Sequence, residues 1–356
     1  MSILPEWAPN IHPLIVHFPI TLLIIAVLID LASLIVKNQK WLKNSATLLY
    51  ATGAASALVT YFTGRNAADT VAIPAAANLI VNEHSDWALR TVVFFGILAV
   101  IRLAVSFKMP EPKLSVSVPL LVGGLAGLFL LYETAEHGAQ LVFQQGVGVE
   151  AAENAQQDLL DALENQQVDA GIINFENGSW AWRPVQGAVT ILEEQFTWYE
   201  GTSADISPEI VPNPEKTSAL AFNLTGSPVM FTGGNVMDGM QADVTMNITE
   251  FTGSVMLVYH VQDAGNYDYI ELDSDIQKLG RMENGTEQVL GEGEVPSTDG
   301  WITVRVFGGG GHFRGYVDEE QYSHGHADDL PPGQFGFRFN GTGTVLIESI
   351  QVQAVQ

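Results

Sequence analysis

Four long apolar stretches constrain what this chain can fold into more than any other feature of its sequence. They cover roughly residues 13–36, 45–63, 87–107 and 116–132, with short polar segments between them. A helix needs about 20 mostly apolar residues to cross a bilayer, with a range of about 17–25, and each stretch qualifies. The sequence therefore predicts an all-α membrane bundle of four transmembrane helices in residues 1–145.

The first apolar stretch is expected to remain in the mature protein. It has no basic segment before it, it is longer than the apolar part of a signal peptide, and no small-residue cleavage site follows it. We therefore interpret it as the first membrane helix and not as a cleaved leader.

The connections between the stretches predict the orientation of the bundle. Two of them, the first-to-second and the third-to-fourth, hold five lysines: Lys37, Lys40, Lys43, Lys108 and Lys113. The connection between the second and third stretches holds only Arg65 with three acids. Basic loops stay on the cytoplasmic side, so both ends of the bundle are expected outside. We expect a protein of the cytoplasmic (inner) membrane with both termini extracytoplasmic.

The charge of the chain changes abruptly near residue 146. Up to Gln145, eight Lys and Arg balance eight Asp and Glu; of the chain's 15 basic and 40 acidic residues, this leaves seven basic and 32 acidic for the remainder. Such a surface repels nucleic acid and anionic lipid, so nucleic acid is excluded as a partner. The absence of cysteine excludes disulfides, thiolate metal sites and covalently attached c-type haem.

The acidic half has the pattern of a β domain. Residues 172–356 consist of short alternating runs broken by Gly, Asn, Asp and Pro, which favours an all-β sandwich. Residues 146–171 are polar and alanine-rich and are interpreted as a helical linker. Because it follows the fourth helix, the sandwich is expected to be an extracytoplasmic (periplasmic) domain.

Four histidines lie at the ends of the apolar stretches: His12, His17, His84 and His137. Ionisable side chains inside a bilayer are costly, so they indicate a functional site by default. With both ends outside, all four imidazoles are expected near the outer membrane face. The alternative is that each histidine caps a helix or hydrogen-bonds a loop carbonyl.

Two equal spacings suggest which helices face each other. Asp30 lies 18 residues after His12, and Arg102 lies 18 residues after His84. Eighteen residues are five whole turns, so each pair shares one face of its helix. If Asp30 and Arg102 pair, as buried membrane charges usually must, His12 and His84 meet at the other end.

Imidazole suits haem iron, copper and zinc, and we prefer haem b, one or two per chain. His17 with His137 and His12 with His84 are the expected axial pairs, and Arg90 would pair with Glu133 or hold an anionic ligand group. Small residues could open a slot for the macrocycle, although close helix packing explains them equally. They are Gly53, Ala54, Ala55, Gly123, Gly124 and Gly127.

Four motifs carry a family resemblance: HPLIVHFPI at 12–20, TGR at 63–65, EHSDWA at 83–88 and EHGAQLVFQQGVGV at 136–149. They resemble the bacterial four-helix membrane family called domain of unknown function 2231. Its histidines are suspected of binding haem for electron transfer, sometimes beside cytochrome modules. The resemblance implies that role for the four histidines only. Gln145 stands where a further histidine is expected, so that ligand is absent.

Residues 172–356 resemble a jelly-roll sandwich of the concanavalin A-like, laminin-G type. The resemblance rests on GNYDYIELD at 265–273, WITVRVFGGGGHFRGYVD at 301–318 and the ending PPGQFGFRFNGTGTVLIESIQV at 331–352. That fold hosts lectins, glycosidases and interaction modules, so a glycan ligand is an option.

Two groups of side chains in the acidic half invite a functional hypothesis. The segment SHGHADD holds His324, His326, Asp328 and Asp329, which are interpreted either as a metal site or, preferably, as a solvated loop. Trp180, Trp182 and Trp198 are expected in the core or at a docking surface and not in a sugar-binding platform.

Together these features predict a membrane-anchored b-type haem electron-transfer subunit of a larger complex. Its partners would be the lipid bilayer and other membrane or extracytoplasmic subunits, with a cytochrome as one option. The alternative is a non-catalytic membrane scaffold whose outer sandwich binds glycan or a partner protein. In either case we expect an electron-transfer or accessory subunit and not an independent enzyme.

Overall fold

The computed structural model describes residues 10–36, 39–71, 73–109, 112–149, 171–175, 177–213, 218–273, 276–295, 298–318 and 320–355. The chain forms two compact units, Met1–Glu153 and Asn154–Gln356. Most of the linker expected at 146–171 lies outside the described residues. Each unit is described by itself.

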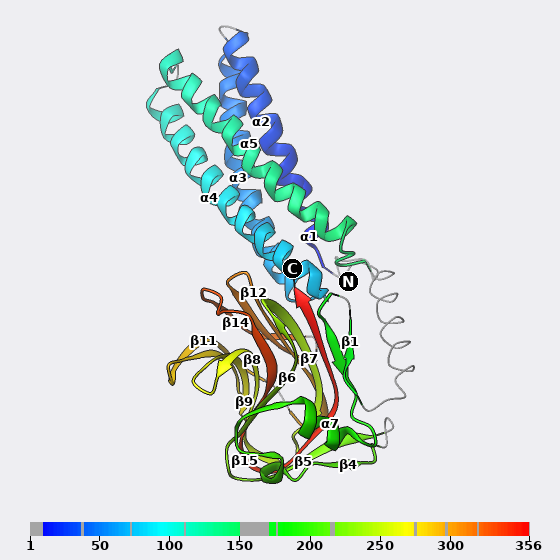
Figure 1. The fold of residues 1–356 in the computed structure, drawn as a ribbon. Coiled ribbons are helices and arrows are strands. Elements are labelled where there is room, and N and C mark those ends of the chain that lie inside the picture. The colour runs from blue at the N-terminus through cyan, green and yellow to red at the C-terminus, as the bar shows by residue number, and fades with distance from the viewer. Residues whose placement is uncertain are drawn as a thin grey trace. The chain divides into compact units, whose positions relative to one another are not determined.

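The helical unit contains four long helices and two short ones (Figure 1). In chain order they are α1 (His12–Ile15), α2 (His17–Ile35), α3 (Lys40–Ala68), the 3₁₀ helix η1 (Ala75–Ala77), α4 (Asn78–Lys108) and α5 (Leu114–Phe143). Pro13 and Pro19 lie in the first turns of α1 and α2, where helix N–H groups need no intrahelical partner.

Among the described residues, three helical segments are long and apolar enough to cross a membrane: His12–Ile35, Ala75–Lys108 and Leu114–Phe143. The second expected span, in α3, does not meet the same criterion of length and hydropathy. Its sequence is rich in Ala, Gly, Ser and Thr, as in ATGAASALVT at 51–60, and these residues are less apolar than the Leu and Ile of the other helices. The predicted apolar helices are therefore present, but four spans are not established.

The helices of this unit form a ring in which α2 contacts α3, α3 contacts α4, α4 contacts α5, and α5 contacts α2. Its interior holds Leu23, Tyr50, Phe95 and Leu121, all buried. Large apolar side chains such as Phe62 face outward along the helices. An apolar exterior of this kind suits lipid and not water.

The second unit consists of antiparallel strands (Figure 1). They are β1 (Ile173–Asn174), β2 (Trp180–Trp182), β3 (Thr197–Glu200), β4 (Glu209–Val211), β5 (Ala219–Thr225), β6 (Val229–Met237), β7 (Gly239–Asn247), β8 (Phe251–Asp263), β9 (Asn266–Asp273), β10 (Ile276–Glu283), β11 (Thr286–Glu294), β12 (Trp301–Gly309), β13 (His312–Val317), β14 (Glu320–His326) and β15 (Gly333–Val355). Two short helices, α7 (Ala188–Gln195) and α8 (Ser203–Ile206), lie between strands.

The long strand β15 joins two sheets into a sandwich. Its first half pairs with β8 and β6, and this first sheet runs β11-β10-β9-β8-β15-β6-β3. Its second half pairs with β7, β5 and β2, and this second sheet continues through β12 and β13 to β14. Each register along β15 is interrupted by a bulge or irregularity where it pairs with β6, β7 and β8.

The core of the sandwich follows from alternation along the strands. Phe335, Phe337 and Phe339 are spaced two residues apart on β15 and are all buried, since alternate side chains face the same side of a sheet. Trp180 and Trp182 are 1% exposed in the same core, which confirms their expected placement. Trp198 packs at the edge of this core, with its ring 4.8 Å from that of Phe231.

Candidate functional site

Three of the four predicted histidines lie at one end of the helical ring. His12 is in α1, His84 near the start of α4 and His137 near the end of α5. His84 is close enough to both His12 and His137 for their charges to interact. His17, in the first turn of α2, is exposed. The structure thus brings together three of the expected imidazoles.

Each of these rings is held by a neighbouring backbone or hydroxyl group. His12 Nδ1 lies 3.2 Å from Thr63 Oγ1 on α3. His84 Nδ1 lies 2.9 Å from the carbonyl of Thr134 on α5, and His137 Nδ1 lies 2.7 Å from the carbonyl of Glu133. A carbonyl partner requires that Nδ1 carry the proton in His84 and His137. Their Nε2 atoms are then acceptors when the rings are neutral.

Glycines from the predicted family motifs support two of the rings. A methyl group placed on Gly64, from the TGR motif, would lie 3.0 Å from Cε1 of His12. A methyl group on Gly138, which follows His137, would lie 3.0 Å from Cε1 of His84. Glycine at these two motif positions therefore allows each imidazole to pack directly against the backbone of a neighbouring helix.

His137 and Arg90 have acidic partners. His137 Nε2 lies 3.2 Å from Glu83 Oε2, and its ring stacks on Trp87 with centroids 6.5 Å apart. Arg90 lies 3.7 Å from Asp86 and 4.7 Å above the Trp87 ring. The pairing of Arg90 with Glu133 that the sequence suggested is replaced by this pairing within α4.

The predicted pair of Asp30 and Arg102 is confirmed. Both guanidinium NH groups donate to the carboxylate at 2.7 Å, and the residues are 3% and 5% exposed. The pair joins α2 to α4, which are diagonal across the ring of helices. Arg102 also lies 4.3 Å above the ring of Tyr50. This bidentate geometry compensates two charges that could not be buried singly.

The space beside the glycines that were proposed to accommodate a macrocycle is filled by neighbouring side chains. Methyl groups on Gly53 and Gly127 would lie 2.7 Å from Leu23 and 2.5 Å from Phe95, and one on Gly124 would collide with Tyr50. Gly123 has Leu98 at 3.4 Å. Close helix packing accounts for these glycines, and they do not provide a haem slot in this arrangement. Haem binding by the histidines stays a prediction.

A second candidate site lies on the face of the first sheet that is turned away from the core. On β9, Ile270 and Leu272 enter the core, so Tyr267, Tyr269 and Glu271 occupy the opposite face. We call this surface the tyrosine face; it comprises Tyr199, Glu200, Met230, Met256, Tyr267, Tyr269, Glu271, Lys278, Glu287 and Arg338.

One row of the tyrosine face crosses six strands in register. Its members are four charged residues and two methionines, in the order Glu200, Met230, Arg338, Met256, Glu271 and Lys278. Across the row, Arg338 Nε lies 2.8 Å from Glu200, and Lys278 Nζ lies 2.8 Å from Glu271. Met230 therefore lies between the two members of the first ion pair, and Met256 lies between the two pairs, whose polar ends are only partly buried.

The Tyr269 hydroxyl and the Lys278–Glu271 ion pair belong to one network. Tyr269 donates a hydrogen bond to Glu287, which also lies 3.2 Å from Lys278. The hydrogen bond from Tyr269 lowers the pKa of Glu287, and that to Glu271 raises the pKa of Lys278. Gly280 leaves the space that the Tyr269 ring fills. With its cations bound to carboxylates, the network suits recognition of polar groups more than proton transfer.

The residues of SHGHADD divide between the end of strand β14 and the exposed segment that follows it. His324 and His326 lie on strand β14, and Asp329 accepts a hydrogen bond from the Gly311 N–H at 3.1 Å. The carbonyl of Asp328 accepts a hydrogen bond from Arg281 at 2.6 Å. The preferred loop interpretation therefore holds for Asp328 and Asp329, which are exposed and follow β14, and is wrong for His324 and His326, which are exposed on the strand itself.

Comparison with known proteins divides the chain in the same way. A family model described as a predicted membrane protein (DUF2231) matches residues 8–151, which confirms the resemblance of that part. No curated protein matches the chain. Solved structures similar to this chain include three that cover between 37% and 50% of it.

Three of these structures illustrate the likeness. A carbohydrate-binding module from Bacillus subtilis is 18% identical, covers 44% of this chain and 94% of its own, and has a TM-score of 0.35. A Bacillus licheniformis β-glucanase is 11% identical over 50% and 99%, with a TM-score of 0.36. A Caenorhabditis elegans galectin is 12% identical over 37% and 95%, with a TM-score of 0.30.

Proposed function

We propose that this chain, whose residues 8–151 match a family of predicted membrane proteins, is a membrane-anchored, non-catalytic binding protein. Its helices anchor it as four spans, and its sandwich presents the tyrosine face to an uncharged polysaccharide outside the cell. The observation that supports this proposal is the row of two ion pairs and two methionines across the first sheet.

The chemistry of the tyrosine face suits hydroxyl-rich ligands. Tyr267 and Tyr269 are 1% and 0% exposed, so their rings support the surface from beneath. Arg338, Glu200 and Lys278 are partly exposed and offer fixed donors and acceptors. A few oriented polar groups over an apolar base are typical of ligand sites that recognise polar molecules. The excess of acids in this half of the chain opposes acidic polymers, which leaves neutral saccharides.

The experiment is a binding measurement on the full-length protein in lipid nanodiscs. Neutral polysaccharides such as amylose, xylan and β-glucan are compared with acidic alginate. Arg338→Ala and Lys278→Ala are expected to weaken binding of the neutral polymer at least about tenfold, since a charged hydrogen bond contributes roughly 1.5–3 kcal/mol.

Arg305→Ala is the matched control. Arg305 pairs with Asp243 on the second sheet, and its side chain is 24% exposed against 20% for Arg338. Its removal is expected to leave polysaccharide binding unchanged. No binding by the unaltered protein, or equal losses in Arg305→Ala and Arg338→Ala, would refute the proposal.

The outward orientation belongs to the proposal and has its own test. It rests on the lysines of the two basic connections. Protease added to intact cells is expected to release fragments of residues 172–356. Protection of that region until the membrane is opened would place the sandwich inside and exclude an external ligand.

The haem hypothesis is separated from this one by an absorption spectrum. A b-type haem with two imidazole ligands would give the purified protein a low-spin Soret band, and His17→Ala would change that band. The filled glycine positions in the helical unit instead support a colourless anchor. A Soret band that is lost on replacing the bundle histidines would restore the electron-transfer function.

A further inference from the structure

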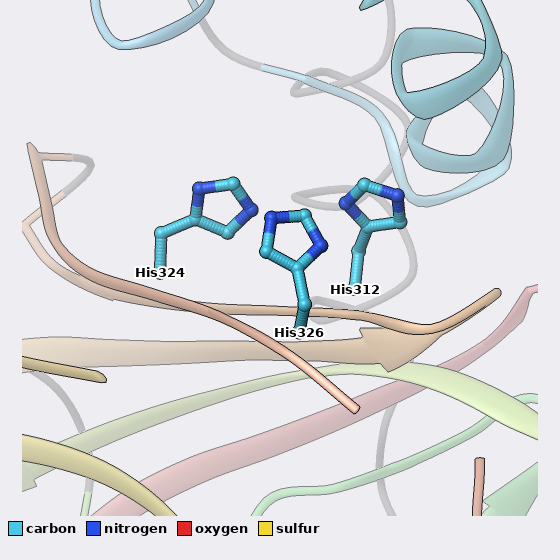
Figure 2. Close-up of side chains that lie close together, drawn as sticks. All are labelled: His312, His324 and His326. Carbon is cyan, nitrogen blue, oxygen red and sulfur yellow. The ribbon is translucent and has the colours of Figure 1, made fainter. Parts of the chain in front are cut away.

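Three histidines converge on the hairpin of β13 and β14, outside the tyrosine face (Figure 2). His312 begins β13, and His324 and His326 lie two residues apart on β14. The register places His312 directly opposite His326. Alternate residues of a strand share a face, and directly opposed residues do too, so all three imidazoles project from the same side of the hairpin.

The distances between the rings are those of a ligand cluster. Ring centroids are 4.5 Å apart for His312 and His326, 4.7 Å for His324 and His326, and 6.0 Å for His312 and His324. One nitrogen from each ring lies within 4.8 Å of the other two. Two ligands on a tetrahedral ion with bonds of about 2.0–2.1 Å are roughly 3.4 Å apart, so small side-chain rotations close the site.

The backbone that carries His312 is fixed by the residues that follow His326. The turn before His312 has Gly310 and Gly311 at φ 60° and 75°, a conformation that favours glycine. Gly311 N–H donates to Asp329 at 3.1 Å, and its carbonyl accepts from Ala327 at 3.2 Å. Hydrogen bonds therefore connect the start of β13, which carries His312, to the segment that follows His326.

The backbone of His324 is supported from behind by β11. A methyl group on Gly291 of β11 would collide with the carbonyl of His324, and one on Gly325 would lie 2.7 Å from Leu290. Glycine at both positions permits this close approach of the strands. The strand that carries His324 and His326 is therefore packed closely against β11. A strand held in this way preorganises its side chains as ligands.

We propose that His312, His324 and His326 bind one divalent transition-metal ion of the Zn²⁺ and Cu²⁺ class. Three neutral nitrogen ligands suit these ions, whereas Ca²⁺ and Mg²⁺ require oxygen. His324 and His326 are exposed and His312 is half-buried, so solvent reaches the cluster and supplies the fourth ligand. The site is independent of the polysaccharide proposal, because it lies on the second sheet.

The test is calorimetric titration of the full-length, metal-stripped protein in detergent with Zn²⁺, and then with Cu²⁺, Ca²⁺ and Mg²⁺. One equivalent of Zn²⁺ or Cu²⁺ is expected to bind, with no response to Ca²⁺ or Mg²⁺ at that site. His324→Ala and His326→Ala are each expected to weaken binding at least tenfold. Binding is also expected to fall as the pH drops below about 6, since protonated imidazole cannot ligate.

Glu320→Gln, an exposed change on the same strand, is the control for adventitious binding to the acidic surface and should retain the full affinity. Co²⁺ provides a readout on the unaltered protein, because nitrogen ligation gives a visible absorption band that Zn²⁺ displaces. The proposal is overturned if neither ion binds stoichiometrically, if the histidine variants bind as the unaltered protein does, or if Co²⁺ gives only its aqueous spectrum.

Discussion

The two units of this chain distribute apolar side chains in opposite ways. Among the described residues, the sandwich exposes only three large hydrophobic side chains, Val236, Ile276 and Val289; all others that are exposed lie in the helical unit. Yet each unit buries a carboxylate–guanidinium pair. The comparison shows that the surrounding medium decides which side chains face outward, while buried charges must be paired in either medium.

The two buried pairs differ in what they connect. Asp30 and Arg102 join helices that are diagonal across the ring. Asp268 and Arg281 are directly opposed on adjacent strands, with Nε 2.6 Å from the carboxylate, and His260 Nδ1 lies 3.0 Å from the same carboxylate. The helical pair thus links two helices that are not neighbours in the ring. The sandwich pair links adjacent strands, and His260 contacts the same carboxylate.

Breaking these pairs is expected to produce the largest effects. Asp30→Ala and Arg102→Ala should each lower the free energy of unfolding by about 3–5 kcal/mol, because one buried charge is left unpaired. The double variant should lose less than the two single losses combined. Denaturant unfolding in detergent measures this, and additive losses would show that the two side chains do not interact.

The same set of single and double variants at Asp268 and Arg281 tests the comparison further. Removing Arg281 leaves Asp268 beside His260, whose Nδ1–H still donates a hydrogen bond to the carboxylate. Arg281→Ala is therefore expected to be milder than Asp268→Ala, whereas Asp30→Ala and Arg102→Ala should be similar. Equal losses from the two sandwich variants would indicate that His260 does not stabilise the carboxylate.

The next prediction concerns glycines that pack closely against a neighbouring side chain, and the helical unit also provides a glycine with open space as a control. Gly127→Ala places a methyl group 2.5 Å from the Phe95 ring and is expected to cost about 1–3 kcal/mol by overpacking. Gly96→Ala meets nothing within 4 Å and should stabilise the helix by up to about 1 kcal/mol. Thermal unfolding of both variants would contradict this picture if Gly96→Ala were the more damaging.

The sandwich counterpart is Gly280, whose missing side chain makes room for the Tyr269 ring. Gly280→Ala is expected to destabilise the sandwich by a similar amount and to disturb the tyrosine face at the same time. Near-ultraviolet circular dichroism would report the displaced tyrosine. An unchanged spectrum would mean that the ring has space to move and that the face is not rigid.

The sequence predicted much of this architecture because it rests on periodicity. The need to pair buried membrane charges led to Asp30 and Arg102, and alternation led to the sandwich and its buried tryptophans. It did not distinguish a slot for a cofactor from helix packing at Gly124, since a glycine has the same sequence signature in both.

The sequence did not predict which residues lie opposite each other on neighbouring strands. His312 was missed as a partner of His326 because only the register of β13 on β14 opposes them. The tyrosine face was missed for the same reason. Its signal, the alternation of Tyr267, Tyr269 and Glu271, was visible, but the contributions of Arg338 and Glu200 depend on strand order.

The smallest expected effect concerns two buried tyrosine hydroxyls, one in each unit. Tyr50 Oη and Tyr259 Oη have no hydrogen-bond partner among the described residues. Tyr50→Phe and Tyr259→Phe should therefore be neutral or stabilising by up to about 1 kcal/mol, because an unsatisfied buried polar group is removed. A clear loss of stability in either variant would reveal a partner for that hydroxyl.

The Tyr259 variant also has an expected pH dependence. Burial raises the pKa of Tyr259 well above its ordinary value, so above a pH of about 10 the unfolded chain ionises while the folded chain does not. The sandwich should lose stability as the pH rises through that range, and Tyr259→Phe should lose less. Unfolding midpoints at neutral and alkaline pH measure the difference. If the two proteins weaken in parallel, Tyr259 ionises freely in the folded state, and the sandwich core admits water where the structure shows none of that side chain exposed.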